Sequence, residues 1–219
     1  VDEPEAKAIF DITIDSQPGI EVLGNMPIKH QALDESTGLL HTQFLEAPHM
    51  SPYLVAFVVG ELQKKSGSTK NGTEVNIYST NAQATISLDF ALDTAIKRIE
   101  FFNDYFDTAY PLPKCDHVAL PDFSSGAMEN WGLITYREMC LLVDKSSAIA
   151  TREYVATVIA HETSHQWFGN LVTMQWWDDL WLNESFATLM EYTAVDAIHP
   201  EWNMWLSYAT HRSEEHTSE

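Results

Sequence analysis

The sequence predicts an α+β fold, in which the end of an N-terminal all-β domain precedes a domain that combines a mixed sheet with helices. Residues 5–66 alternate apolar and polar side chains between turn signals such as QPG and NMP, a pattern typical of half-buried strands. Residues 84–107, 151–168 and 180–198 space their apolar side chains at helical intervals, and the last helix is expected to end before Pro200. Strands followed by helices are the element order of an α+β chain.

Three further stretches are predicted as strands of the second domain, at residues 74–80, 116–123 and 132–144. Residues 65–73 (KSGSTKNGT) are small and polar throughout, which predicts a linker. We therefore expect residues 1–68 to be the C-terminal part of the β domain and residues 69–211 to be an incomplete catalytic domain.

The charge of the chain excludes two classes of partner. Twelve basic and 32 acidic side chains give a formal charge of −20, whereas binding of nucleic acid or an anionic membrane requires a basic surface. The longest apolar run, at residues 53–59, is far too short to span a bilayer. The two cysteines, Cys115 and Cys140, are expected to be buried thiols rather than a disulfide, which is usual in a reducing compartment.

Both ends of the chain are expected to be cut. The first residues already have the pattern of a strand, and the last eight, RSEEHTSE at 212–219, contain no apolar residue. This octapeptide is similar to the translation of a common sequencing-adapter DNA. We expect residues 212–219 to be a non-native tail; the alternative is a natural polar tail.

The stretch AHETSHQWFGN at 160–170 carries the strongest chemical signal. Four residues advance a helix by about 6 Å and slightly more than one turn, so His161 and His165 lie on the same face. Two imidazoles so placed can bind one Zn²⁺, and Glu162 can contact a water at the metal. A catalytic zinc needs a third protein ligand, and Glu184, on the next predicted helix, can supply it.

A second motif, SSGAMENWG at 124–132, could bind an amine. Gly126 and Ala127 have almost no side chain, so a ligand backbone can approach this strand edge closely. Glu129 could then pair with a peptide α-ammonium group, which is mostly charged at neutral pH. From spacing alone, a glutamate in an ordinary turn remains the alternative.

GAMENWG at 126–132, followed by HETSHQWFGNLVTMQWWDDLWLNESFA at 161–187, resembles the zinc aminopeptidases of the aminopeptidase N type. The resemblance extends over nearly all of residues 1–211 and is most similar to the branch found in lactic-acid bacteria, which implies a cytoplasmic enzyme. It also implies a thermolysin-like fold for residues 69–211. A tyrosine that stabilises the oxyanion in this family lies beyond the last residue of the chain.

The family pattern matches this sequence residue by residue. It implies one Zn²⁺ per active site, Glu162 as general base, and peptides with a free N-terminus as substrates. The ligands it implies are His161, His165 and Glu184, and the substrate-binding residues are Gly126, Ala127, Met128, Glu129 and Asn130.

Other roles stay open at this point. Asp179 and Glu191 are candidates to orient the histidines, with a surface position as the alternative. Trp176, Trp177 and Trp181 are expected to be core residues rather than substrate contacts. Alternatives to the peptidase are a relative that hydrolyses epoxides with the same zinc site, and an inactive metal-binding homologue.

Overall fold

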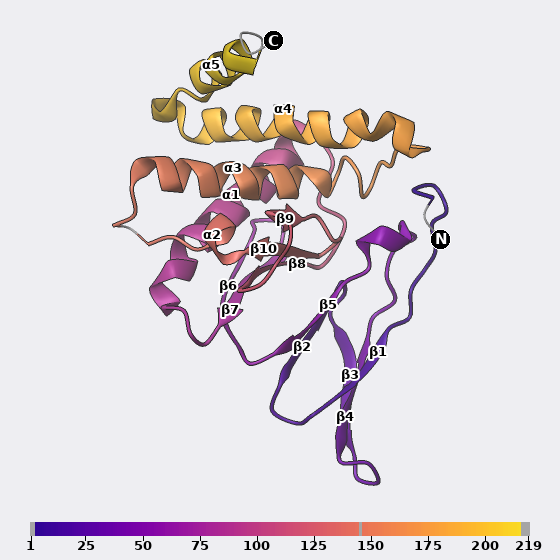
Figure 1. Cartoon of the computed structure of the whole chain (residues 1–219). Helices are drawn as coiled ribbons and strands as arrows, with labels where there is room; N and C mark the ends of the chain where they lie inside the picture. The colour runs from indigo at the N-terminus through magenta and orange to yellow at the C-terminus, as the bar shows by residue number, and fades with distance from the viewer. Residues whose placement is uncertain (1–2, 145, 216–219) are drawn as a thin grey trace.

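The computed structural model describes the backbone of residues 3–144 and 146–215, and the side chains as far as residue 210. It confirms the predicted α+β class: strands β1–β5 form one end of the molecule, and the helices lie at the other (Figure 1). A five-stranded sheet lies between them. Among the described helices, none combines the length and the apolar composition needed to cross a membrane.

The first part of the chain forms two small antiparallel units. Three strands pair in the order β1-β4-β3, and two more form a ribbon. The three strands are β1 (Thr13–Ser16), β4 (Leu39–Phe44) and β3 (Ile28–Asp34), and the ribbon consists of β2 (Glu21–Gly24) and β5 (Phe57–Gly60). A short 3-10 helix, η1 (Pro52–Leu54), precedes β5. These elements confirm the strand-rich prediction for residues 5–66.

The central sheet is mixed and has the order β6-β7-β8-β10-β9. Its strands are β6 (Leu62–Ser68), β7 (Glu74–Thr80), β8 (Lys114–Leu120), β9 (Ala127–Met128) and β10 (Leu133–Arg137). β7, β8 and β10 are parallel, while β6 and β9 are antiparallel to their neighbours. Parallel strands need a crossover, and helix α1 (Leu88–Tyr105) provides it between β7 and β8. The short strand β9 forms an edge of this sheet.

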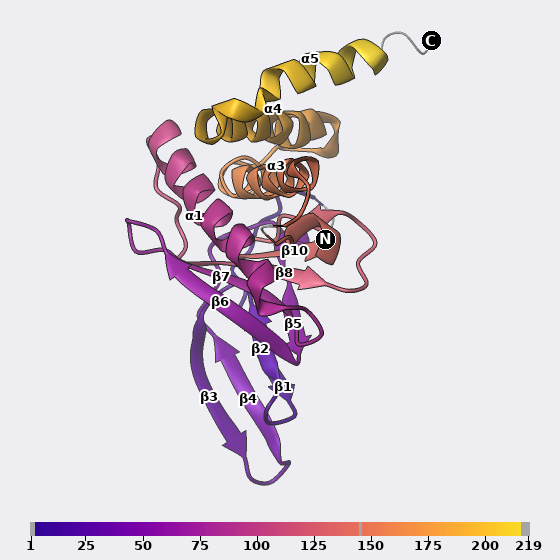
Figure 2. The same cartoon turned by 90° about the vertical axis from the view of Figure 1, so that its left-hand side faces the viewer.

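The helices stack on one face of the sheet. α1 packs on β6 and β7, and α3 (Ile149–His165) packs between α1 and α4 (Leu180–Ile198) (Figure 2). The remaining helical segments are η2 (Thr85–Ser87), α2 (Glu138–Leu141), η3 (Trp177–Asp179), η4 (Pro200–Trp202) and α5 (Met204–Glu215). Because α3 is covered on several sides, its buried residues do not form a single stripe; near its C-terminal end the four consecutive residues Glu162, Thr163, Ser164 and His165 are all buried.

The main hydrophobic core lies between the sheet and these helices. Side chains from every layer are fully buried in it, including Ile77, Ile134, Ile99, Phe102 and Ile159. Burial of this apolar surface contributes on the order of 2 kcal/mol for each such side chain. The core therefore holds α3 against the sheet edge that carries β9.

Two buried polar side chains connect the N-terminal strands to the central sheet. The Lys114 Nζ donates to the carbonyl oxygens of Gly24 (2.9 Å) and Gly132 (2.8 Å) and to Asp116 Oδ2 (2.7 Å). Asn25 Nδ2 donates to the carbonyl oxygen of Trp131 at 2.9 Å. Both connections reach the chain immediately after residues 126–130.

Four details differ from the sequence predictions. The linker predicted at 65–73 is wrong, because residues 65–68 belong to β6 and pair with β7 across a tight turn. Residues 138–141, predicted as strand, form α2, and the helix predicted to reach residue 168 ends at His165. Helix α5 was not predicted.

The proposed division at residue 68 stays a prediction, although the pairing of β6 places that strand in the second sheet. The proposed non-native tail at 212–219 also stays a prediction. Its residues 216–219 lie outside the described part, and only the backbone of 212–215 is described, as part of α5.

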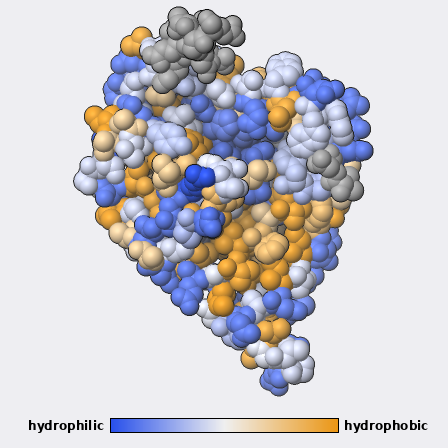
Figure 3. Space-filling view, in the orientation of Figure 1, coloured by the Kyte–Doolittle hydropathy of each residue, from blue (hydrophilic) through white to orange (hydrophobic). Residues whose placement is uncertain are grey.

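The N-terminal strands expose apolar side chains. In Figure 3 an apolar area covers the region of β1–β5. The exposed large apolar residues of this part are Ile9, Ile28, Leu33, Leu45, Phe57 and Val59.

Candidate metal centre

Three side chains from two helices converge at one point above the sheet. The Nε2 atoms of His161 and His165, both on α3, are 3.0 Å apart. Glu184 Oε2, on α4, is 3.3 Å from the Nε2 of His161 and 3.6 Å from that of His165. Atoms bound to a tetrahedral zinc at its usual bond lengths are about 3.3–3.4 Å apart. The triangle of ligand atoms therefore has the size that zinc requires.

The outer nitrogens of both histidines are held by acceptors. His161 Nδ1 lies 2.7 Å from Glu191 Oε2, and His165 Nδ1 lies 3.0 Å from the carbonyl oxygen of Phe168. A carbonyl oxygen can only accept, so His165 carries its proton on Nδ1 and directs a lone pair from Nε2. The same holds for His161 against the carboxylate. Two lone pairs facing each other at 3.0 Å repel unless a proton or a cation lies between them, so the donor set fits a metal ion.

The pKa values of the ligands reflect the interactions between the histidines and the neighbouring carboxylates. Burial lowers the pKa of His161, but the adjacent carboxylates of Glu184 and Glu191 outweigh this effect and raise the pKa to about 10, so a proton can occupy the place of a cation. The two adjacent imidazoles hold the pKa of Glu184 well below its usual range. The Glu184 side chain is 49% exposed, so burial opposes this decrease only in part. Within the described residues, these three form the one group that could hold a metal ion.

Glu162 is buried beside the ligands and has an unusual proton affinity. The pKa of Glu162 is raised to about 7, chiefly by burial; the histidines oppose this increase, and the charges of Glu129 and Glu184 add to it. A group that titrates near neutral pH is suited to accept and return a proton.

The segment 126–130 lies at the sheet edge next to α3. Ala127 and Met128 form the edge strand β9, in register with Tyr136 and Thr135 of β10. A Cβ added at Gly126 would have Cys140 Sγ as its nearest neighbour, at 3.8 Å, so the fold itself does not require glycine there. The space beside Gly126 is therefore open enough for another molecule to approach the backbone.

Glu129 and Asn130 follow β9 and are both buried. Asn130 Nδ2 donates to Thr135 Oγ1 at 3.1 Å, which fixes the chain as it leaves the edge strand. The charge of Glu129 raises the pKa values of both Glu162 and His165, so its carboxylate lies in the same electrostatic field as the metal group. The structure therefore brings together the two motifs that the sequence singled out.

The residues predicted to orient the histidines have different positions. Glu191 accepts from His161, as described above. Asp179 is exposed at the end of η3, and in the part of the chain that the structure describes it forms no hydrogen bond or ion pair with either histidine. The proposal for Asp179 is not supported by this geometry, because an orienting residue must contact the imidazole.

The tryptophans predicted as core residues are largely outside it. Trp176 is 46% exposed and Trp181 is 59% exposed, while Trp177 is half-buried, with its ring 5.7 Å from that of Tyr53. Their prediction relied on size and apolarity, which do not determine on which side of a loop a ring lies. The expectation for the cysteines is confirmed: Cys115 and Cys140 are free and buried.

Sequence reasoning missed several residues around the centre. Tyr53, from η1, donates to the carbonyl oxygen of Gly169 at 3.4 Å, and burial, Glu129 and Glu184 all raise the pKa of its phenol. Gln166 and Asn170 follow α3 and bind the chain at Glu129. None of the three belongs to a spacing pattern, so the sequence gives no signal for Tyr53, and the two amides could only have been suspected from their place beside the histidines.

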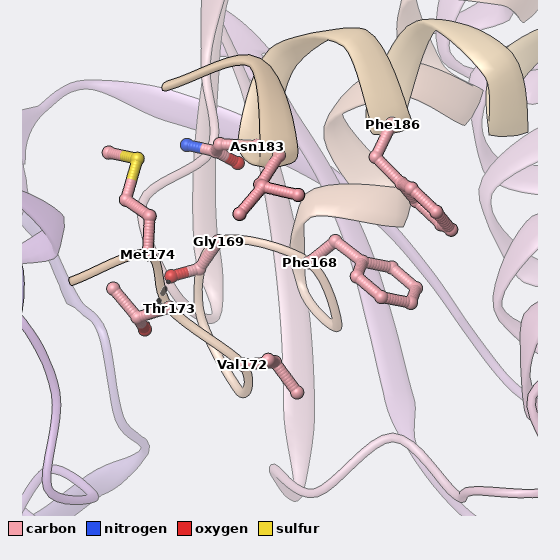
Figure 4. Close-up of a pocket in the computed structure, with 8 residues that line it drawn as sticks. Phe168, Gly169, Val172, Thr173, Met174, Asn183 and Phe186 are labelled. Carbon is pink, nitrogen blue, oxygen red and sulfur yellow. Dashed lines mark hydrogen bonds between the residues drawn. The ribbon is translucent and has the colours of Figure 1, made fainter. Parts of the chain in front are cut away.

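An apolar cavity of about 190 Å³ adjoins the ligand-bearing turns (Figure 4). Phe168 and Val172 line it from the loop after α3, and Asn183 and Phe186 line it from α4. No titratable group is among its lining residues. The cavity is therefore separate from the reacting groups, although Asn183 directly precedes Glu184.

Comparison with known proteins identifies the family. The model of the peptidase family M1 domain matches residues 90–219, and that of the peptidase M1 N-terminal domain matches residues 1–54. The chain is 58% identical over 207 residues to aminopeptidase N of Lactococcus lactis subsp. lactis, which covers 94% of this chain and 24% of that protein. It is 52% identical to aminopeptidase N of Lactobacillus helveticus, over 96% of this chain and 25% of that protein. It is 48% identical to aminopeptidase M1-D of Oryza sativa subsp. japonica, over 94% of this chain and 24% of that protein.

The chain thus spans about a quarter of the length of the curated relatives that it matches. The match to the M1 domain model, over residues 90–219, includes the metal group, the buried Glu162 and the edge segment 126–130. On the strength of both family models and these identities, the chain belongs to peptidase family M1.

Proposed function

We propose that the protein is a zinc-dependent aminopeptidase that hydrolyses the N-terminal residue from peptides. The observation that carries the proposal is the common location of a metal-binding triangle, a buried carboxylate with a pKa of about 7, and a second buried carboxylate, Glu129, whose charge acts on both. Relatives named aminopeptidase N add support.

In this proposal His161, His165 and Glu184 hold the zinc, and Glu191 orients His161. The ion would be Zn²⁺, because two imidazoles and one carboxylate with an open fourth position form the donor set of a catalytic zinc. A bound zinc would lower the pKa of a water and polarise a carbonyl group.

Glu162 acts as the general base. It accepts a proton from the attacking water and returns it to the departing amine nitrogen of the cleaved peptide bond. The nearby cation would lower its pKa below 7, and burial counteracts that decrease, so the carboxylate remains basic enough to take the proton.

Glu129 binds the substrate's α-ammonium group. Gly126, Ala127 and Met128 would contact the substrate chain, because β9 is an edge strand of the sheet. Asn130 fixes the end of that strand. An ammonium held at Glu129 leaves the first peptide bond at the metal, which makes the enzyme an exopeptidase. We further propose that the enzyme is cytoplasmic, by analogy with the lactic-acid-bacterial branch that its sequence resembles.

The test uses full-length zinc-loaded protein and a panel of aminoacyl-naphthylamides. We expect cleavage that a chelator abolishes and added zinc restores. We also expect N-acetylation of the best substrate to abolish most of the cleavage. Equal cleavage of free and acetylated substrates would contradict the aminopeptidase proposal, and cleavage unaffected by the chelator would contradict the metal.

A further inference from the structure

Two buried amide side chains converge on one carbonyl oxygen, that of Glu129. Gln166 Nε2 donates to it at 3.1 Å, and Asn170 Nδ2 donates to it at 2.9 Å. Both side chains are fully buried. A carbonyl oxygen offers two acceptor positions, and both are used here by side chains from the end of the metal-bearing helix.

Gln166 makes two further contacts. Its Nε2 also donates to the carbonyl oxygen of Glu162 at 3.2 Å, and its Oε1 accepts from the N–H of Gly132 at 3.3 Å. One amide therefore binds the backbone of the proposed general base and the backbone at both ends of the segment 129–132. Asn170 is fixed to the same helix, because its N–H donates to the carbonyl oxygen of His165 at 3.1 Å.

The sheet alone gives little support at this position. β9 has two residues and pairs with β10 on one side, so Glu129 lies just beyond the end of a very short ladder. The tight turn after α3 brings Gln166 and Asn170 back toward the sheet edge. These amides are thus the direct hydrogen-bonded connection between α3 and the carbonyl of Glu129.

We propose that Gln166 and Asn170 are positioning residues that fix the distance between Glu129 and the metal-bearing helix, and thereby determine which amine the enzyme accepts. This inference rests on the proposed function, in which Glu129 binds the substrate's ammonium group. It assigns the selectivity for an α-amine to two side chains that do not touch the substrate.

The test compares three substrates in the full-length zinc-loaded protein: the best aminoacyl-naphthylamide, its β-homologue, whose amine lies one carbon further from the carbonyl, and its N-acetyl derivative. Gln166→Met keeps the length of the side chain and removes its three hydrogen bonds. Asn170→Ser is the milder second variant, because it removes one donor and leaves Gln166 in place.

Asn76→Leu serves as the matched control. Asn76 is also a buried amide with three hydrogen bonds, to Glu74, Asp116 and Ser66, but it lies on β7, on the far side of β8 from β10 and β9. It should reduce thermal stability as the other variants do, without changing the preference among substrates.

For both Gln166→Met and Asn170→Ser we expect zinc content equal to that of the wild type. kcat/KM for the α-amine substrate should fall about ten- to a hundred-fold, as for a displacement of about 1 Å in a positioned group. kcat/KM for the β-homologue and the acetylated substrate should fall far less, so that the preference for the α-amine substrate decreases.

Three results would overturn the inference: an equal loss of kcat/KM for all three substrates, loss of zinc from both variants, or the same decrease in preference for the α-amine substrate in Asn76→Leu. Failure of the proposed function would look different, because the wild type itself would then not distinguish the free from the acetylated substrate.

Discussion

Gly169 lies in the loop between the two helices of the metal centre, and replacing it with alanine should weaken zinc binding. Its φ is +123°, where an L-residue is strained, and an added Cβ would overlap Asn183 Oδ1 and lie 3.1 Å from Asn183 Cγ. Asn183 is buried and directly precedes Glu184, so we expect its displacement to reach the start of α4. The backbone strain costs about 1–3 kcal/mol, and the overlap adds about 1–3 kcal/mol.

The matched control is Gly72→Ala. Gly72 has a φ of +88°, and a Cβ there would have no neighbour within 4 Å, so this variant carries the backbone strain without the overlap. Chemical denaturation should show Gly169→Ala to be less stable than Gly72→Ala by about 1–3 kcal/mol. Zinc affinity, measured by competition with a chromogenic chelator, should fall about 10–100-fold in Gly169→Ala, as for the loss of a group that orients a ligand. Equal stabilities and unchanged zinc affinity would refute the idea that Asn183 transmits the displacement to Glu184.

Four further predictions concern the site and the sheet below it. His165→Ala should lose most of its zinc by elemental analysis, and undiminished zinc would exclude His165 as a ligand. Glu162→Gln should keep its zinc while kcat falls by about two to four orders of magnitude, the usual share of general-base catalysis; loss of zinc would instead make Glu162 a ligand. Glu129→Ala should reduce kcat/KM for free-amine peptides by the equivalent of about 2–5 kcal/mol, and N-acetylation should then add little; full additivity in this double cycle would mean that the amine is bound elsewhere. Burial lowers the pKa of His117 from 6.5 to about 3. Below pH 6.5 the unfolded chain therefore binds a proton that the folded chain does not, and stability should fall by up to about 1.4 kcal/mol per pH unit. We therefore expect the unfolding free energy of His117→Gln, measured by denaturant titration at several pH values, to depend less steeply on pH than that of the wild type. An identical dependence on pH would mean that other groups cause it.

The sequence predicted the elements that carry the chemistry, because these follow strong local patterns. The helix at 180–198 and the strand at 74–80 lie where their periodicity indicated, and the helix predicted at 151–168 lies at 149–165. The spacing of His161 and His165 fixes their common helix face whatever the tertiary structure, which is why two of the metal-binding side chains could be named before the fold was known.

The sequence could not predict features that depend on tertiary contacts. The polar segment at 65–73 has the composition of a linker, yet the neighbouring strand β7 pairs with its first half. Composition does not specify such a partner. Gln166 and Asn170 likewise look like ordinary polar residues after a helix, and their role emerges only when the turn returns them to the carbonyl of Glu129.

Lys114 connects the N-terminal strands to the sheet through carbonyl oxygens, and this has an evolutionary consequence. Gly132 has a φ of +76°, and a Cβ there would overlap the carbonyl oxygen of Asn25, so this acceptor of Lys114 also requires glycine. An insertion or deletion within β2 or the turn after it would move the Gly24 carbonyl away and leave the buried ammonium group with one hydrogen bond fewer. Natural variation in this family should therefore keep both the glycine at 132 and the length of the chain between Glu21 and Asn25.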